Sequence, residues 1–335
     1  MSTDKNIAIL VGGTGMEAPI SLSSGRFIYE NFPRDYADPF IIYLHKDFTI
    51  SVYNDYSFCQ GQGTLLEYNG QGKRYSVGCI KEACLENGYA SFDVLPMVHG
   101  LSCEDGKILH LFECLNIKYA GFDAKSSVLT FDKVLSKLVL QDKGYPVLDY
   151  QWFSKGDDLK RPFANQTIFI KPSRQGSSVG VQRVEPTDDF TQAMNDVFIH
   201  DNKVLIEPEC IGREIECAVI EIGGEWRASS IGELTFNDSF YSYEAKYKSE
   251  ESKASIVELS PHINTMIQTT AINVVKTLGG RGFARVDFFL ENDKIYINEV
   301  NTLPGMTPIS MFPVLLSQIG IAPKQMILHL IQEIS

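Results

Sequence analysis

The sequence predicts an α/β protein whose first part holds a mostly parallel sheet and whose later part is of the α+β kind. Strand-like and helix-like segments alternate over residues 6–125, which is typical of a parallel sheet with crossover helices. In the later part, pairs of strands are separated only by short turns, which indicates antiparallel hairpins. With 335 residues, the chain is long enough for two or three domains.

The N-terminal elements follow from apolar runs and from the residues that end them. A buried strand is expected at residues 6–13, "NIAILVGG", where paired glycines end the apolar run. Pro19 suits the first turn of a helix at residues 20–29. Other expected segments are strands at 39–44 and 92–98, loops or a hairpin at 55–72, and a helix at 107–115 with apolar residues at helical spacing.

The later elements are expected to be hairpins and helices. A double glycine, Gly223-Gly224, is a hairpin signal between strands at 213–222 and 225–234. A polar, aromatic and charged segment at 236–253 is long enough to be a functional loop. The remaining expected elements are helices at 132–144, 187–197, 262–278, 310–318 and 323–333, and strands at 167–172, 203–208, 282–290 and 294–300.

Composition excludes several classes of partner. The formal charge of −12, from 30 basic and 42 acidic residues, does not suit binding to nucleic acid or to anionic membranes. We see no apolar run of about 20 residues and no signal-peptide cleavage pattern. Seven cysteines without a C-x-x-C pair suit reduced thiols better than a disulfide framework or a zinc site. We therefore expect a cytoplasmic protein.

Two neighbouring strands carry oxygen ligands at their ends. Asp287 lies on one strand of the last predicted hairpin, and Glu299 and Asn301 share a face of the other. If the strands pair, two carboxylates and an amide oxygen meet, and these are ligands that Mg²⁺ prefers. Singly, such residues are usually solvated strand ends, but their spacing across a hairpin favours a metal site. Arg285 could serve only as an ion-pair partner of Asp287.

A glycine- and serine-rich loop follows another strand. In "IKPSRQGSSVG" (170–180), Gly176 permits close approach of the backbone to a phosphate, and Lys171 supplies a positive charge. The segment lacks the Walker A pattern and, taken alone, could be an ordinary hairpin. Lys133, on a predicted helix, is the expected partner of this loop, although a single helix lysine is usually only solvated.

The first strand is followed by a competing signal. Residues 13–18, "GTGMEA", match the G-x-G-x-x-A fingerprint of dinucleotide-binding proteins, which makes an NAD-dependent oxidoreductase an alternative. However, Glu17 would place a carboxylate where the pyrophosphate should lie at the helix N-terminus. That position suits a substrate ammonium group better.

Seven motifs in order resemble those of the D-alanine–D-alanine ligases of the ATP-grasp superfamily. They are "GGTGMEAPISLSSG", "HGLSCEDG", "FDKVLSK", "IKPSRQGSSVG", "YEAKY", "GFARVDFFL" and "NEVNTLPGMT", and they span nearly the whole chain. The resemblance implies an ATP-grasp fold behind an N-terminal parallel-sheet domain. It divides the chain into an N-terminal domain (1–128), a central ATP-grasp subdomain (129–211) and a C-terminal one (212–335).

The family resemblance also implies a reaction. ATP would activate one D-alanine as D-alanyl phosphate, and a second D-alanine would displace phosphate to give D-alanyl-D-alanine for peptidoglycan precursor synthesis. Two Mg²⁺ ions, or Mn²⁺ instead, would assist, and the resemblance allows a homodimer. Alternatives are a D-alanine–D-serine or D-alanine–D-lactate ligase, or a nucleotide-binding homologue without turnover.

The resemblance assigns roles residue by residue. For ATP it implies Lys133, Lys171, Ser177, Ser178, Lys246, the adenine-hinge acid Glu207 and the ribose acid Glu214, and for the metal Asp287, Glu299 and Asn301. For the first D-alanine it implies Glu17 and the neighbouring His99, with Ser177 and Tyr247 tying Glu17 to a mobile loop. For the oxyanion it implies Arg285 and the backbone N–H of Gly305, and for the second D-alanine Ser310 and Met311.

Less specific interpretations remain for some of these residues. His99 could be an ordinary half-buried histidine, Tyr247 and Lys246 solvent-facing loop residues, and Ser310 only a helix N-cap. The sequence also departs from the family pattern at three places. Leu109-His110 stands where the family usually has Gln-Gly. Ser102-Cys103 stands where the family usually has two glycines, and Pro208-Glu209 follows the hinge acid, where proline removes a backbone donor.

Overall fold

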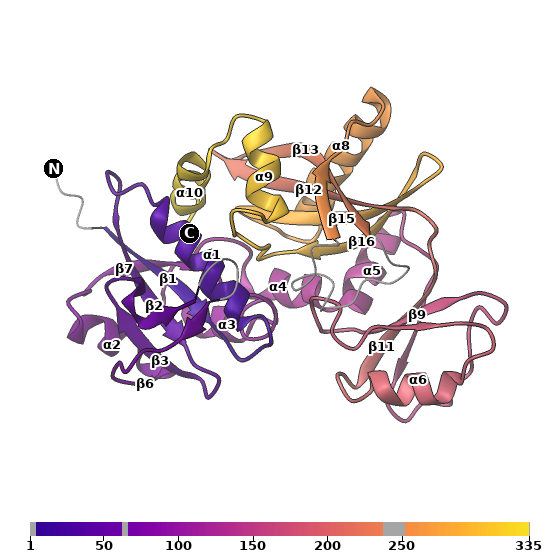
Figure 1. The fold of residues 1–335 in the computed structure, drawn as a ribbon, viewed down its shortest axis with the longest axis horizontal. Helices are drawn as coiled ribbons and strands as arrows, with labels where there is room; N and C mark the ends of the chain where they lie inside the picture. Colours follow the sequence, from indigo (N-terminus) through magenta and orange to yellow (C-terminus); the bar gives the residue numbers. More distant parts are fainter. Residues whose placement is uncertain (1–4, 62–65, 237–251, 335) are drawn as a thin grey trace.

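The structure, a computed structural model, describes residues 5–61, 66–236 and 252–334 (Figure 1). These residues form three larger sheets, a two-stranded sheet and the helices that cover them. The predicted parallel-sheet domain at the N-terminus and the antiparallel sheets of the later part are confirmed, although the N-terminal sheet is mixed, with two parallel and two antiparallel pairings.

The N-terminal sheet has the strand order β6-β3-β2-β1-β7. β1 pairs in parallel with β2 and β7, whereas β3 and β6 complete one edge in antiparallel fashion. Its strands are β1 (Asn6–Gly12), β2 (Asp38–Leu44), β3 (Thr49–Tyr53), β6 (Tyr75–Ser76) and β7 (Phe92–Pro96); its helices are α1 (Ala18–Glu30), α2 (Ile80–Glu86) and α3 (Lys107–Cys114). The expected hairpin within 55–72 is the pair β4 (Cys59–Gln60) and β5 (Glu67–Tyr68).

The central sheet has the order β10-β9-β11-β8 and is antiparallel. Its elements are β8 (Gln151–Ser154), β9 (Ile168–Pro172), β10 (Gln182–Val184), α6 (Phe190–Val197) and β11 (Lys203–Pro208). Helices α4 (Ala124–Phe131) and α5 (Lys133–Asp142) connect it to the N-terminal sheet. The prediction omitted α2, α4, β3, β6, β8 and β10, and also β14 (Ser252–Ile256) in the last sheet. β6, β8 and β10 are short and only partly buried, and α4 buries small polar residues, so these four have no clear hydrophobic pattern.

The C-terminal sheet has the order β14-β13-β12-β15-β16 and is built from the two expected hairpins. Gly223 and Gly224 in the first turn, and Asn292 and Asp293 in the second, all have positive φ, as tight hairpin turns require. The strands are β12 (Arg213–Ile222), β13 (Glu225–Phe236), β14 (Ser252–Ile256), β15 (Phe283–Glu291) and β16 (Lys294–Asn301), and the helices are α8 (Pro261–Thr277), α9 (Met311–Gln318) and α10 (Pro323–Gln332).

Three buried apolar clusters underlie this arrangement. One lies within the central sheet and α6, and a second lies between the C-terminal sheet and α8. The largest joins the N-terminal sheet to α9 and α10, which also pack on β12 and β13, so these helices link the first domain to the C-terminal sheet (Figure 1). The boundaries at residues 128 and 211 remain a proposal.

We compared the helices with the requirements for a membrane span. Among the described residues, no single helix is long and apolar enough to cross a membrane; α9 and α10 reach that length and hydropathy only together, and they are bent by 104°.

Candidate active site

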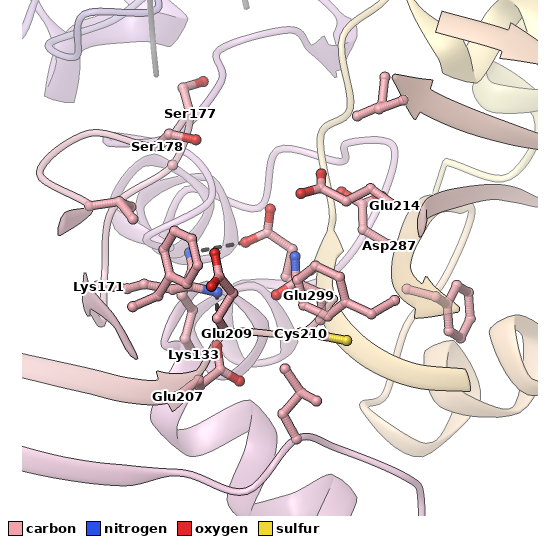
Figure 2. A pocket seen from close by; sticks show the side chains of 18 of the residues that line it. Lys133, Lys171, Ser177, Ser178, Glu207, Glu209, Cys210, Glu214, Asp287 and Glu299 are labelled. Carbon is pink, nitrogen blue, oxygen red and sulfur yellow. Dashed lines mark hydrogen bonds and ion pairs between the residues drawn. The ribbon is translucent and has the colours of Figure 1, made fainter. Parts of the chain in front are cut away.

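A cavity of about 310 Å³ lies between the central and C-terminal sheets. Lys133 and Lys171 approach it from one side, and Glu214, Asp287 and Glu299 from the other (Figure 2). Its apolar lining consists of Leu148, Phe169, Val179, Val181, Leu234, Phe288 and Phe289, among others. A cavity with an apolar part and converging charges suits a ligand that combines a flat ring with anionic groups.

A buried ion-pair cluster closes one end of this cavity. Glu207, with only 1% of its side chain exposed, lies between two ammonium groups: Lys171 Nζ at 2.8 Å from Oε2 and Lys137 Nζ at 2.7 Å from Oε1. Burial alone would raise the pKa of Glu207, but the two lysines lower it to about 2. Sequence reasoning missed Lys137, although it stands one helical turn after Lys133 in "FDKVLSK".

Lys133 connects the glycine- and serine-rich loop at 170–180 to the C-terminal sheet. It begins α5, and its Nζ donates to the backbone oxygen of Gln175 at 2.7 Å. The same Nζ lies 3.1 Å from Glu299 Oε2 on β16. The predicted association of Lys133 with the loop at 170–180 is therefore present in the structure, and Lys133 reaches the loop through a backbone carbonyl.

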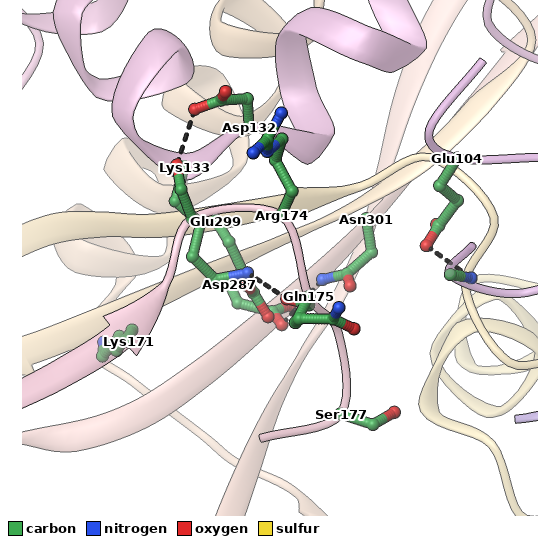
Figure 3. Close-up of polar contacts among 12 residues, drawn as sticks. Glu104, Asp132, Lys133, Lys171, Arg174, Gln175, Ser177, Asp287, Glu299 and Asn301 are labelled. Carbon is green, nitrogen blue, oxygen red and sulfur yellow. Dashed lines mark hydrogen bonds and ion pairs between the residues drawn. The ribbon is translucent and has the colours of Figure 1, made fainter. Parts of the chain in front are cut away.

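The three predicted metal ligands lie together on β15 and β16 (Figure 3). Asp287 stands directly opposite Glu299 in the register of the two strands, at a bulge. Asn301 Nδ2 donates to Asp287 Oδ2 at 2.9 Å. Arg285 Nε and Nη2 each lie 2.7 Å from one oxygen of Asp287, so the ion pair considered from the sequence is formed.

The donor set of this cluster suits a hard divalent cation. Within the described residues, His, Cys, Asp and Glu side chains form no group of three or more that could hold a metal ion. A cation between Asp287 and Glu299 would therefore need the amide oxygen of Asn301 as a further protein ligand. Two carboxylates and one amide, with the other positions left to water or phosphate, match the ligand preference of Mg²⁺.

Arg285 is anchored on its buried side. The guanidinium also lies 3.3 Å from Glu216 Oε1 on β12. Burial lowers the pKa of Arg285, but the Asp287 and Glu216 carboxylates outweigh that effect and hold the pKa well above its usual value. The side chain is thus a fixed positive charge beside the proposed metal ligands.

The loop after β9 has an unusual backbone. Ser177 and Ser178 both have positive φ, 50° and 57°, a conformation that non-glycine residues adopt at an energetic cost. Both residues line the cavity, at the end away from Glu207 (Figure 2). Strained backbone at a cavity wall is typical of a loop shaped for a ligand.

Glu17 lies where the loop at 170–180 meets the N-terminal domain. The Ser177 hydroxyl donates a hydrogen bond to Glu17 Oε1. A Cβ added at Gly100 would lie 2.2 Å from Glu17 Oε2, and one added at Gly176 would lie 3.3 Å from it. The absence of side chains at these two glycines therefore makes room for the Glu17 carboxylate.

His99 is buried and held by two hydrogen bonds. Nδ1 lies 2.7 Å from the backbone oxygen of Leu303 and Nε2 lies 2.9 Å from Ser24 Oγ. Because a carbonyl only accepts, Nδ1 carries the proton, and the Ser24 hydroxyl donates to Nε2 while accepting from Met306 N–H at 3.1 Å. Burial lowers the pKa of His99, in keeping with a neutral ring. His99 thus links α1 to the loop after β16.

Glu104 is a site residue that sequence reasoning missed, although it stands in the quoted motif "HGLSCEDG". Its carboxyl oxygens accept from Gly100 N–H at 3.0 Å and from Leu303 N–H at 2.8 Å. Burial, with Glu17 nearby, raises its pKa to about 8. Glu104 therefore joins its own loop, after β7, to the loop after β16, which His99 also contacts.

The residues expected around the second substrate lie at the start of α9. Ser310 Oγ accepts from Thr307 N–H at 3.0 Å and lies 2.7 Å from Thr307 Oγ1, so its hydroxyl faces Thr307 instead of capping α9. A Cβ at Gly305 would lie 2.8 Å from Ser310 Oγ. Met311 is buried against Gly232, so its side chain belongs to the core.

Two of the three departures from the family pattern, Ser102-Cys103 and Pro208-Glu209, each form a local contact. Ser102 has φ of 94°, a glycine-like conformation, and its Oγ lies 2.8 Å from Thr14 Oγ1 in the loop after β1. Beside Pro208, Glu209 is held by Arg183 at 2.7 Å and 3.1 Å. Lys246 and Tyr247 lie outside the described residues.

Comparison with known proteins accounts for both parts of the chain. Residues 6–122 match the family "D-ala D-ala ligase N-terminus" and residues 139–332 match "D-ala D-ala ligase C-terminus". A D-alanine–D-alanine ligase of Shouchella clausii is 36% identical, over 98% of this chain and 94% of the relative.

Solved structures agree with these matches. The D-alanine–D-alanine ligase from Coxiella burnetii has a TM-score of 0.78 at 28% identity and covers 98% of this chain and 94% of its own. The D-Ala:D-Ser ligase VanG from Enterococcus faecalis has a TM-score of 0.77 at 26% identity, with 98% and 99% covered. The expected ATP-grasp fold is confirmed, and the dinucleotide-binding interpretation of residues 13–18 is wrong. The chain belongs to the D-alanine–D-alanine ligase family.

Proposed function

We propose that this chain is an ATP-dependent ligase that joins two D-alanines to D-alanyl-D-alanine for peptidoglycan precursor synthesis. The observation that carries the proposal is the hydrogen bond between Ser177 and Glu17. It places a carboxylate suited to an amino-acid ammonium directly beside the strained loop of the nucleotide cavity. Such a site would bring an amino acid and a terminal phosphate together, as acyl-phosphate formation requires.

The first step would transfer the γ-phosphoryl group to a carboxylate. A carboxylate oxygen of the first D-alanine attacks the γ-phosphorus, the bond to the β-phosphate oxygen breaks, and ADP leaves. Glu17 would hold the ammonium of this D-alanine, while Lys133, Lys171 and the loop hydroxyls of Ser177 and Ser178 would hold the phosphates. Such catalysis consists mainly of positioning and of neutralising charge.

Asp287, Glu299 and Asn301 would hold Mg²⁺, which neutralises the negative charge of the phosphate oxygens when bound. Support for this assignment comes from their alignment across β15 and β16 and from Glu299 lining the cavity. Glu214 and Glu207 would contact the ribose and the base, respectively.

The second step would form the peptide bond. The amine of the second D-alanine attacks the carbonyl carbon of the D-alanyl phosphate, the amine loses a proton, and inorganic phosphate leaves. Arg285 and the backbone N–H of Gly305 would stabilise the oxyanion of the tetrahedral intermediate. Ser310 and the backbone at Met311 would bind the acceptor carboxylate at the N-terminus of α9, where helix amides favour an anion.

A D-alanine–D-serine ligase is the second candidate, because VanG matches 98% of this chain with a TM-score of 0.77. Incubation of the protein with ATP, Mg²⁺ and D-alanine should release phosphate and yield D-alanyl-D-alanine, measured by mass spectrometry. Dipeptide formation only with added D-serine would favour the second candidate, and nucleotide binding without turnover would favour a non-catalytic homologue.

A further inference from the structure

Lys137 is a buried lysine for which the proposed reaction has no role. Only 2% of its side chain is exposed, and it stands behind Glu207, outside the described residues that line the cavity. Its Nζ lies 2.7 Å from Glu207 Oε1 on β11 and donates to the backbone oxygen of Ile297 on β16 at 3.3 Å. One ammonium group therefore joins the two sheets that enclose the cavity.

Lys137 also determines what Glu207 presents to the cavity. Each oxygen of Glu207 faces one ammonium group, Lys137 on Oε1 and Lys171 on Oε2, so the plane of the carboxylate is fixed. An ionised carboxylate can only accept hydrogen bonds. Burial lowers the pKa of Lys137, but the Glu207 carboxylate opposes that shift. At this end of the cavity the Glu207 carboxylate therefore presents only acceptor oxygens, beside the donor ammonium of Lys171.

We propose that Lys137 is a positioning residue that makes the cavity select a 6-amino purine, because it holds Glu207 as a fixed hydrogen-bond acceptor. A 6-amino purine donates from its exocyclic amine, whereas a 6-oxo purine would direct a carbonyl oxygen at the carboxylate. Placing like acceptors together is costly in a buried site and discriminates strongly between ligands. The inference rests on the proposed function only in placing a purine nucleotide in this cavity.

A purely structural role for the same ion pair predicts a different result. If Lys137 only stabilises the packing of the sheets, its loss weakens the binding of 6-amino and 6-oxo purine nucleotides equally. If Lys137 fixes Glu207, its loss weakens the binding of a 6-amino purine nucleotide more than that of a 6-oxo purine nucleotide. The ratio of the two affinities separates these cases, because a general loss of stability leaves the ratio unchanged.

The test compares the binding of ATP and of inosine triphosphate by calorimetry, with Mg²⁺ and without D-alanine. The wild-type protein should prefer ATP, and Lys137→Met should reduce that preference by about tenfold or more, mainly through weaker ATP binding. Lys137→Arg, which keeps the positive charge, should restore much of it. An ATP preference in Lys137→Met equal to that of the wild type would overturn the proposal.

Lys203→Met is the matched control. Lys203 lies on β11, the strand that carries Glu207, and pairs with Asp132 at the start of α5. Its loss should lower the melting temperature without changing the ATP preference. If Lys137→Met does not fold, the double variant Lys137→Met/Glu207→Gln removes both charges. Its amide both donates and accepts, so ATP and inosine triphosphate should bind within a few-fold of each other. A preserved ATP preference in the double variant would contradict the proposal.

Failure of this proposal is distinct from failure of the proposed function. Selective ATP binding that depends on Lys137, without dipeptide formation, would refute the ligase activity alone. Dipeptide formation with a nucleotide preference that does not depend on Lys137 would refute this inference alone. A wild-type protein that binds neither nucleotide would refute both.

Discussion

The two ends of the candidate site are built from different interactions. At the nucleotide end, charged side chains neutralise one another: Lys171 and Lys137 pair with Glu207, and Lys133 pairs with Glu299. At the amino-acid end, single hydrogen bonds join loops from distant parts of the chain. These are Ser177 to Glu17, His99 to Leu303, and Glu104 to Leu303. Glu104 also accepts from Gly100 N–H within its own loop.

The difference indicates how each end accepts its ligand. Lys133 and Glu299 neutralise each other, so the nucleotide end is charged but compensated. Under the proposed function, a polyphosphate would become the partner of Lys133 and a cation that of Glu299. The amino-acid end depends on shape, since the backbones of Gly100 and Gly176 pack against the Glu17 carboxylate. Changes of charge should therefore affect the first end most, and changes of volume the second.

The largest effect is expected from Glu299→Gln, which tests the nucleotide end. The substitution removes a negative charge that faces Lys133 and is a proposed metal ligand, while it preserves the size of the side chain. We expect kcat to fall by at least about 100-fold, because the charge of the transferred phosphoryl group is then poorly neutralised. Steady-state release of phosphate measures this.

Glu233→Gln provides the control for that measurement. Glu233 lies on β13 of the same sheet and pairs with Arg213 at 2.6 Å, outside the cavity lining. Its loss should leave kcat within about twofold of the wild-type value, as surface ion pairs contribute little. Equal kcat values for Glu299→Gln and the wild type would contradict the proposed role of Glu299 as a metal ligand.

A smaller but selective effect is expected from Gly100→Ala at the amino-acid end. The new Cβ would lie 2.2 Å from Glu17 Oε2 and would force that carboxylate to move. We expect KM for D-alanine to rise by roughly 10- to 100-fold, whereas affinity for ATP changes little. The measurements are initial rates over a range of D-alanine concentrations and ATP binding by calorimetry.

Gly88→Ala separates this steric effect from backbone strain. Gly88 also has a positive φ, 94°, but a Cβ there meets no described atom within 4 Å. It should cost about 1 kcal/mol of stability without altering KM. If both alanine variants change KM alike, packing against Glu17 is not the cause.

Ser177→Ala and Ser178→Ala sharpen the comparison further, because the two neighbours have similar backbone conformations. Only Ser177 donates to Glu17 among the described contacts of this pair. Its loss should raise KM for D-alanine by roughly tenfold, as expected for a hydrogen bond to a charged group. Ser178→Ala should instead raise KM for ATP, and the opposite assignment would contradict the proposed division of the loop.

The sequence predicted those parts of the site that follow from strand pairing. Asp287 and Glu299 lie on the two strands of one hairpin and are paired in its register, so both side chains point to the same face. This follows because side chains in a strand alternate between the two faces with a period of two. Likewise, the apolar runs and the Gly223-Gly224 turn predicted the C-terminal sheet, because burial and positive φ leave local marks in a sequence.

Contacts between distant segments could not be predicted in this way. Glu104 and Leu303 are 199 residues apart, and no local pattern indicates that the N–H of one loop meets the carboxyl of another. Lys137 resembled any other lysine on an amphipathic helix, and only the packing of two sheets on α5 shows that it is buried. Burial of a polar residue is a property of the assembled fold.

The smallest effect is expected on the pH dependence of the melting temperature, through Glu104 at the amino-acid end. The pKa of Glu104 rises from its ordinary value of 4.5 to about 8 on folding, so between these values the folded protein holds a proton that the unfolded chain releases. The resulting stabilisation is complete below pH 4.5 and is lost as pH rises towards 8. Glu104→Gln cannot titrate, so its melting temperature should fall less between pH 5 and pH 8 than that of the wild type.

We expect the fall in melting temperature from pH 5 to pH 8 to be several degrees smaller in Glu104→Gln than in the wild type. A change of about 1 kcal/mol shifts Tm by ~2–4 °C in chains of 150–250 residues. Differential scanning calorimetry at several pH values measures this difference. Glu86→Gln is the control, because Glu86 is exposed and its pKa is lowered by Lys73, so it should not flatten the curve between pH 5 and pH 8. Parallel curves for Glu104→Gln and the wild type would mean that Glu104 is already ionised in the folded protein, with its two N–H donors sufficient to hold the charge.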